Sequence, residues 1–235
     1  MKKKIIAMIP AREGSKRLKL KNLVMLCGKP LISYSIEAAK KSGIFDEIFI
    51  NSDSMIFKKI ANKHKVSFYL RPKNLGKSSV KSDDIVLDFI KKNDCDLIVW
   101  VNPISPLQTA TEIKKVVRYF IKKKLNSLIT VIDKKVHFVF KNRPVNFLLN
   151  KKFQQTQKLT PVNEFCYSIM MWTKKTFFKS MQKKRYAILH GKIGYHKVNN
   201  LSGIIVKTKE DIKLLEAIIL LKKNQKKSNM TKYYK

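Results

Sequence analysis

The chain has 235 residues, of which 51 are Lys or Arg and 16 are Asp or Glu, so that its net charge is +35. Its hydrophobic content of 44% argues against a disordered protein, and no apolar run approaches the roughly 20 residues of a membrane span. Three scattered cysteines and four histidines without a metal-ligand spacing argue against a disulfide framework and a zinc site, and they favour a reduced, cytoplasmic location.

The positive charge has two explanations. A polyanion partner such as RNA, DNA or a membrane surface would favour Lys and Arg. A coding bias would do so too, because the abundant Lys, Asn, Ile and Phe share AT-rich codons. The charge is spread along the chain, with no basic helix interleaved with aromatic residues. The second explanation is therefore favoured, and RNA binding is kept as an alternative function.

Helices and strands alternate along the first part of the chain. In chain order we predict a strand over 4–9, a helix over 30–43, a strand over 46–52, a helix over 55–65, a strand over 66–70, a helix over 83–93, a strand over 96–101, a helix over 110–124 and a strand over 127–132. Gly43 closes the first helix. The helix over 110–124 carries one apolar face, made of Ile113, Val116, Val117, Phe120 and Ile121. Strands separated by helices predict an α/β fold with a doubly wound, mostly parallel sheet.

The pattern changes after Ile132. Residues 133–185 hold short extended pieces, "HFVFK", "FLLN" and "CYSIMMW", with no helix before about Lys174. We predict a small β-containing lobe here, within a single domain over 1–225, and the apolar "SIMMW" segment suggests pairing with a second copy. A last helix over 209–223 has one apolar side, and residues 226–235 are expected to be a frayed basic tail.

The loop "PAREGSKRLKLKN" follows the first strand, at the strand end where open parallel sheets bind ligands. Gly14 and Ser15 are expected to let the backbone turn sharply and present N–H groups. The cations are Arg12, Lys16, Arg17 and Lys21. Backbone donors and cations together predict a phosphate site; a solvated basic loop is the alternative that composition leaves open. Neither the Walker pattern nor G-x-G-x-x-G is present.

Four stretches within about residues 4–125 resemble, in order, the motifs of CMP-sialic acid synthetases and related acylneuraminate cytidylyltransferases: "IPAREGSKRLKLKN", "GKPLISYSIEAAKKSGIFDEIFINSD", "SFYLRPKNLGKSSVKSDDIVLDFI" and "VNPISPLQTATEI". The resemblance implies a Rossmann-like nucleotidyltransferase fold with a small dimerisation lobe, and so a homodimer. It also implies transfer of CMP from CTP to a nonulosonic, sialic-acid-like sugar acid, with release of pyrophosphate, for surface glycan synthesis.

The resemblance also assigns site residues. Arg12 and Lys21 are the expected catalytic residues, because cations stabilise the charge that develops in nucleotidyl transfer. The expected nucleotide-binding residues are Ala11, Arg12, Gly14, Ser15, Lys16, Lys21, Asn22, Arg71, Ser82 and Asn102. The expected substrate-binding residues are Asn102, Ser105 and Gln108. Asp53 fits the family's Ser/Thr-Asp pair or, equally well, the N-cap of the next helix.

The resemblance implies a Mg²⁺ cofactor held by two Asp residues before the last helix. In "LSGIIVKTKEDI" those positions are Ile205 and Lys207, and neither side chain can ligate magnesium. Asp211 is a nearby candidate ligand, although with Glu210 it also fits the start of the last helix. The sequence therefore leaves two alternatives open, an active transferase and a nucleotide-binding homologue with little catalysis.

Overall fold

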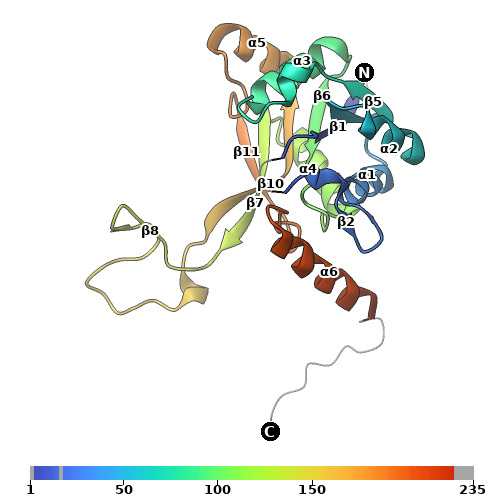
Figure 1. Cartoon of the computed structure of the whole chain (residues 1–235). Coiled ribbons are helices and arrows are strands. Elements are labelled where there is room, and N and C mark those ends of the chain that lie inside the picture. The colour runs from blue at the N-terminus through green and yellow to red at the C-terminus, as the bar shows by residue number, and fades with distance from the viewer. Residues whose placement is uncertain (1–2, 16–17, 225–235) are drawn as a thin grey trace.

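A computed structural model describes residues 3–15 and 18–224. Its body is a seven-stranded sheet with helices on both faces (Figure 1). The strands are β1 (Ile5–Ala11), β4 (Glu47–Ser52), β5 (Ser67–Leu70), β6 (Leu97–Val101), β7 (Ser127–Lys134), β10 (Val162–Thr173) and β11 (Ile193–Lys197), in the spatial order β11-β7-β10-β6-β1-β4-β5. Only β10 among them runs antiparallel to its neighbours. The predicted α/β fold with a mostly parallel sheet is confirmed.

Two groups of helices cover the sheet. The helices are α1 (Leu31–Ser42), α2 (Ile56–His64), α3 (Ser82–Lys92), α4 (Ala110–Lys122), α5 (Lys174–Lys184) and α6 (Lys209–Asn224). Helices α1, α2 and α4 bury apolar side chains on one face, and α3 and α5 bury theirs on the other. Every element predicted over residues 4–132 is present, because each has a strong local apolar pattern and a clear end such as Gly43, whose φ is 60°.

The apolar face predicted for α4 needs one correction. Ile113, Val116, Val117 and Phe120 are buried, but Ile121 is 40% exposed. At 100° per residue, Ile121 falls at the edge of the stripe that the other four form. Helix α4 begins with a capping box, in which Thr109 and Glu112 bond each other's backbone N–H groups.

The apolar segment "SIMMW" lies in an interior strand of the sheet and not at an exposed face. Residues 168–172 belong to β10, which fills the gap between β6 and β7, and Ser168, Ile169 and Met171 are fully buried. This segment therefore gives no support to pairing with a second copy. The predicted lobe over 133–185 is also shorter than expected, since residues 162–184 belong to β10 and α5, which pair with or pack on the sheet.

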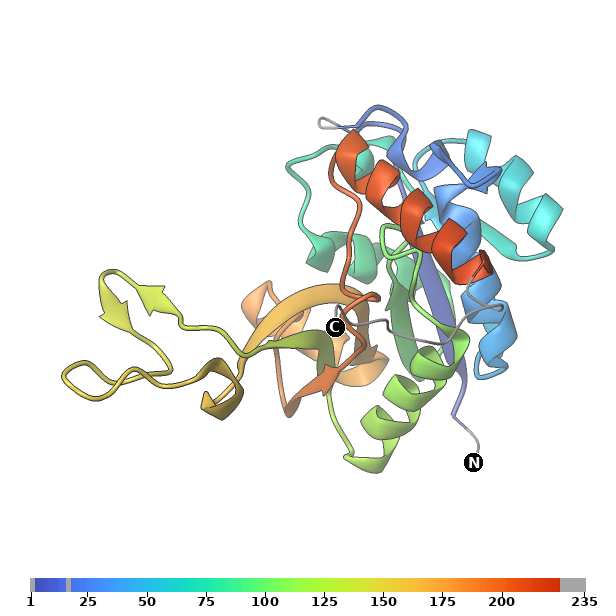
Figure 2. The same ribbon diagram turned by 90° about the horizontal axis from the view of Figure 1, so that it is seen from below.

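Residues 135–161 form an arm that projects from the sheet (Figures 1 and 2). It contains the short strands β8 (Val139–Phe140) and β9 (Arg143–Pro144) and a 3₁₀ turn over Thr156–Lys158, whereas "FLLN" forms no strand. Several of its apolar side chains are exposed, including Phe140, Leu148 and Phe153. Dimerisation through this arm stays a prediction.

The last segment of the described chain closes one end of the body. Helix α6 buries Ile212 and Leu215 against a small cluster that includes Leu26 of the hairpin formed by β2 (Met25–Leu26) and β3 (Lys29–Pro30). The predicted tail over 226–235 lies outside the described residues. None of the described helices has both the length and the apolar character needed to cross a membrane.

Candidate functional site

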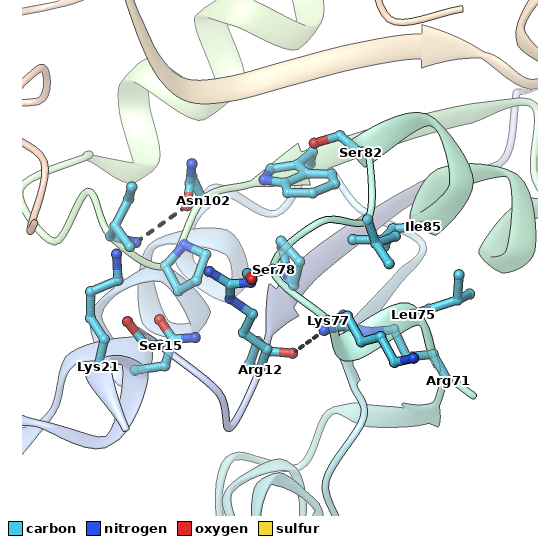
Figure 3. A pocket seen from close by; sticks show the side chains of 17 residues that line it. Arg12, Ser15, Lys21, Arg71, Leu75, Lys77, Ser78, Ser82, Ile85 and Asn102 are labelled. Carbon is cyan, nitrogen blue, oxygen red and sulfur yellow. Dashed lines mark hydrogen bonds between the residues drawn. The ribbon is translucent and has the colours of Figure 1, made fainter. Parts of the chain in front are cut away.

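A pocket of about 290 Å³ opens at the carboxyl ends of β1 and β6. Its walls come from the loop after β1, the segment between β5 and α3, and the residues after β6. In Figure 3, Lys21, Ser15 and Asn102 lie on one side, Leu75, Lys77 and Ile85 on the other, and Arg12 between them. The predicted residues that line it are Ala11, Arg12, Ser15, Lys21, Asn22, Arg71, Ser82 and Asn102. The structure thus brings most of the predicted nucleotide site together.

The lining is strongly cationic. Arg12, Lys21, Arg71 and Lys77 contribute to it, and no carboxylate does among the residues described. Such a lining suits a polyphosphate, since charge-assisted hydrogen bonds from Lys and Arg to phosphate oxygens are among the strongest in proteins. Lys77, Ser78 and Trp100 were not foreseen. Lys77 and Ser78 lie in a polar loop and Trp100 near the end of a strand, so the strand-end rule could have found the last of them.

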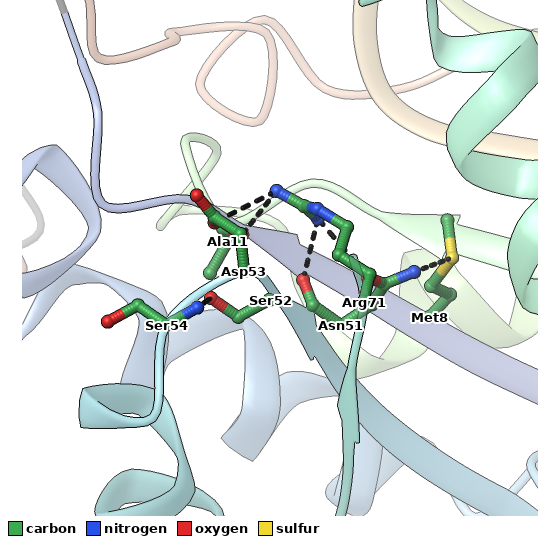
Figure 4. A network of polar contacts seen from close by, with 7 residues as sticks. All are labelled: Met8, Ala11, Asn51, Ser52, Asp53, Ser54 and Arg71. Atoms are coloured by element: carbon green, nitrogen blue, oxygen red, sulfur yellow. Dashed lines mark hydrogen bonds and ion pairs between the residues drawn. The ribbon is translucent and has the colours of Figure 1, made fainter. Parts of the chain in front are cut away.

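Arg71 holds the pocket wall together. Its side chain is 2% exposed and donates hydrogen bonds to the carbonyl oxygens of Asn51 at 3.0 Å and Ala11 at 2.8 Å (Figure 4). Its Nη2 also pairs with Asp53 Oδ1 at 3.3 Å. Burial lowers the pKa of Arg71, and the nearby Asp53 opposes this shift. Arg71 therefore joins the ends of β1 and β4, while its buried Nε has no hydrogen-bond partner among residues 3–15 and 18–224.

Asp53 is not a helix N-cap. The residue before α2 is Met55, and its side chain makes no capping hydrogen bond. Asp53 instead pairs with Arg71 and lies against the 3₁₀ turn over Lys73–Gly76. A Cβ atom at Gly76 would stand 2.0 Å from Asp53 Oδ2. The turn can approach the carboxylate because residue 76 has no side chain.

Two predictions for the opening loop have different outcomes. Gly14 is not among the described residues that line the pocket, its φ is not in the left-handed region, and an added Cβ would meet no atom of the described residues within 4 Å. Gly14 is therefore not held in a conformation that only glycine adopts readily, and the sharp turn expected at Gly14 and Ser15 stays a prediction. The predicted phosphate ligand Lys16, like Arg17, lies outside the described residues.

The predicted substrate residues Ser105 and Gln108 do not reach the pocket. Both are buried, at 0% and 4% exposed, and neither lines it. The Gln108 amide donates to Glu112 at 3.0 Å, and Glu112 also accepts from Ser202 Oγ at 2.5 Å and from the Asn199 N–H at 2.7 Å. Glu112 thus holds the turn over 199–203 to α4. The T-x-x-E spacing of Thr109 and Glu112 could have indicated a helix cap, but it carries no information about these distant contacts.

The segment expected to hold a metal does border the site. Lys21, which lines the pocket, donates from Nζ to the Val206 carbonyl oxygen at 3.2 Å. Ile205 and Lys207 are the sequence neighbours of Val206, so both lie next to this contact. Asp211 accepts hydrogen bonds from the N–H groups of Lys207 at 2.7 Å and Thr208 at 2.8 Å, and so caps α6. Burial raises the pKa of Asp211, but these hydrogen bonds outweigh it and hold the pKa below its usual range.

The described residues do not fit a magnesium ion held by protein carboxylates. No group of three or more His, Cys, Asp or Glu side chains within 3–15 and 18–224 is arranged to hold a metal. The aligned positions carry Ile205 and Lys207, which cannot ligate magnesium, and Oδ2 of Asp211 already accepts hydrogen bonds from Lys207 and Thr208 at the start of α6.

Comparison with known proteins identifies the family. The model of the family described as "Cytidylyltransferase" matches residues 6–227. The chain belongs to the cytidylyltransferase family. The N-acylneuraminate cytidylyltransferase of Escherichia coli O18:K1:H7 is 38% identical over 125 residues, which cover 51% of this chain and 29% of that protein. The pseudaminic acid cytidylyltransferase of Campylobacter jejuni serotype O:2 is 44% identical over 89 residues, which cover 37% of this chain and 38% of the relative. The resemblance found in the sequence is confirmed.

Solved cytidylyltransferases share the fold. CMP:2-keto-3-deoxy-manno-octonic acid synthetase, solved with CTP, superposes with a TM-score of 0.67 at 14% identity and covers 93% of this chain and 99% of its own. The 4-diphosphocytidyl-2C-methyl-D-erythritol synthase of Anaerococcus prevotii superposes with a TM-score of 0.66 at 16% identity. The match covers 93% of this chain and 99% of that protein's chain. The match to the curated N-acylneuraminate relatives spans only 29% to 33% of their length.

Proposed function

We propose that this cytidylyltransferase transfers CMP from CTP to a nonulosonic, sialic-acid-like sugar acid and releases pyrophosphate. The observation that carries the proposal is the cationic, carboxylate-free lining contributed by the described residues at the strand ends of a cytidylyltransferase fold. Relatives named for N-acylneuraminate and for pseudaminic acid support the choice of acceptor class. In this proposal the CMP-sugar serves surface glycan synthesis.

The chemistry is an in-line displacement at phosphorus. A hydroxyl oxygen of the acceptor forms a bond to the α-phosphorus, the bond from that phosphorus to the bridging oxygen breaks, and pyrophosphate leaves. The hydroxyl proton passes to solvent. Arg12 and Lys21 bind phosphate oxygens and stabilise the negative charge that develops on them, without acting as acid or base. Asn102 lies on the same side of the pocket as Lys21 and is proposed to contact nucleotide and acceptor (Figure 3).

Magnesium dependence is a prediction of the resemblance that the described residues do not support. We propose that side-chain cations supply the positive charge around the triphosphate, with Lys77 added to Arg12 and Lys21. The exposed apolar groups of the arm over 135–161 support a homodimer as a further part of the proposal.

The test is release of pyrophosphate by the purified full chain. CTP is offered with N-acetylneuraminic acid, pseudaminic acid or 2-keto-3-deoxy-octonic acid, in Mg²⁺, Mn²⁺ or EDTA, and ATP replaces CTP as the control. We expect release with CTP and at least one nonulosonic acid and none with ATP. Binding of CTP by calorimetry without any release would identify a nucleotide-binding homologue and contradict the proposed transferase.

A further inference from the structure

The ladder between β7 and β10 is interrupted opposite a single residue. Val131 pairs with Phe165 and Ile129 pairs with Met170, so the four residues 166–169 stand opposite Thr130 alone. An interruption of this kind is a β-bulge, which bends a strand and redirects its side chains and carbonyl groups. β7 and β10 pair on both sides of the bulge, residues 127–129 with 170–172 and residues 131–134 with 162–165. The second of these paired segments leads into the arm over 135–161, so the bulge lies at the base of the arm.

Thr130 holds the bulge through its hydroxyl group. The residue is fully buried, and its Oγ1 accepts from the Ile169 N–H at 3.0 Å and donates to the Ile169 carbonyl oxygen at 3.0 Å. The same oxygen lies 3.0 Å from Ser168 Oγ. Cys166 Sγ donates to the Thr130 carbonyl oxygen at 3.4 Å. The hydroxyl group of Thr130 therefore provides hydrogen bonds to β10 where the backbone pairing between β7 and β10 is interrupted.

The bulge forces a backbone conformation that needs such support. Tyr167 has a φ of 54°, in the left-handed region that side chains with a Cβ rarely adopt. A residue held there costs free energy, which persists only when the surroundings fix it. The polar contacts of Thr130 flank Tyr167 on both sides, at Cys166 and at Ser168.

The strained turn presents two carbonyl groups to a pocket residue. The Asn102 N–H donates to the Ser168 carbonyl oxygen at 3.0 Å, and its side-chain Nδ2 donates to the Tyr167 carbonyl oxygen at 3.1 Å. Its Oδ1 accepts from the Ile104 N–H at 3.4 Å, the contact drawn beside Asn102 in Figure 3. These contacts orient the amide and leave one Nδ2 hydrogen and one Oδ1 lone pair for a ligand.

We propose that Thr130 is a positioning residue for the transfer reaction, because it fixes the bulge whose carbonyl groups orient the Asn102 amide in the pocket. Thr130 itself does not line the pocket. The inference rests on the proposed function for its effect on the rate, but the orientation of Asn102 can be measured without turnover. The proposal also means that the bulge at the base of the arm over 135–161 contributes to the geometry of the site.

Two matched variants separate the hydroxyl from the shape of the side chain. Thr130→Val keeps the branched shape and removes the hydroxyl, whereas Thr130→Ser keeps the hydroxyl. We expect Thr130→Val to lower kcat for pyrophosphate release by about tenfold to a hundredfold, because misplacement of a substrate-positioning group has effects of this size. Thr130→Ser should stay within about threefold of the unmodified protein, since it retains the hydrogen bonds.

A double-mutant cycle shows whether the effect passes through Asn102. In an Asn102→Ala background, Thr130→Val should change kcat by no more than about twofold, because two residues that act as one unit are not additive. A loss of the same size in both backgrounds would mean that Thr130 acts through general stability, and it would overturn the inference.

The ¹⁵N resonance of the Asn102 side-chain amide, assigned with Asn102→Ala, gives a readout without turnover. It should shift in Thr130→Val and stay in place in Thr130→Ser. An unchanged resonance in a folded Thr130→Val protein would overturn the inference. If Thr130→Val does not fold, Ser168→Ala, which keeps the backbone carbonyl, should produce a smaller shift, and no shift would again contradict the inference. If no sugar acid supports turnover, the proposed function fails while the resonance still tests the positioning role.

Discussion

The ammonium group of Lys21 lies 3.2 Å from the carbonyl oxygen of Val206, although the two residues are 185 positions apart in the sequence. Val206 is fully buried, and its N–H donates to the carbonyl oxygen of Ile104 at 2.9 Å. The connection before α6 is thereby fixed against both the opening loop and the residues after β6. Substitutions at Lys21 or in this connection are therefore expected to change ligand binding in the pocket.

Lys21→Met should weaken CTP binding by about tenfold to a hundredfold, because a hydrogen bond to a charged group contributes about 1.5–3 kcal/mol. Titration calorimetry with CTP measures this directly. Lys19→Met is the matched control, since Lys19 is exposed and does not line the pocket. Equal CTP affinity in the two variants would show that the cationic pocket is not the phosphate site.

Replacing Ile205 and Lys207 together by Asp should make the reaction more responsive to magnesium. Carboxylates are the ligands that Mg²⁺ prefers, and both positions flank the Lys21 contact. We expect Mg²⁺ to raise pyrophosphate release by roughly tenfold more in the double variant than in the unmodified chain. Thermal unfolding is followed alongside, because Ile205 is partly buried.

Lys209→Asp is the control for this change of charge, because Lys209 is exposed at the start of α6. The prediction fails if Lys209→Asp gives the same gain. It also fails if EDTA already abolishes rapid turnover by the unmodified chain, since other groups would then hold the metal.

Arg71→Met should destabilise the fold by about 3–5 kcal/mol, because it leaves a mostly buried Asp53 without its partner. The carbonyl groups of Ala11 and Asn51 lose their donor as well. Urea unfolding at neutral pH measures the loss. Arg118→Met, at an exposed position on α4, should change stability by less than about 0.5 kcal/mol. Similar losses in the two variants would contradict the clamp assigned to Arg71.

Asp211 predicts a pH dependence of stability. Its pKa is lower in the folded chain than in the unfolded chain, so the charged carboxylate stabilises the fold. That contribution is present above the unfolded pKa of about 3.9 and is lost as the pH falls through the folded value. In urea unfolding, Asp211→Asn should be less stable than the unmodified chain at pH 6, and the difference should shrink at pH 3.

Asp94→Asn is the control for this titration, because the side chain of Asp94 is 89% exposed and forms a surface ion pair with Lys174. It should change stability little at either pH. A difference for Asp211→Asn that stays constant from pH 6 to pH 3 would show that the carboxylate charge is not what caps α6.

The sequence by itself determined the elements over residues 4–132 and the place of the pocket. Helix and strand periods depend on residues a few positions apart, and parallel strands bring their carboxyl ends to one edge. The same reasoning found Arg12, Lys21 and Asn102, because they follow strands in motifs that resemble a known family.

Only the tertiary structure decided which distant groups meet. An apolar run such as "SIMMW" suits a sheet interior and a dimer interface equally well, and only the assembled sheet placed it in β10, between β6 and β7. The family resemblance assigned Gln108 to the substrate site, yet its buried amide donates to Glu112 and does not line the pocket. The bulge at Thr130 has no local signal at all, since four residues of one strand oppose a residue 36 to 39 positions away, and pairings of that kind arise only when the whole sheet assembles.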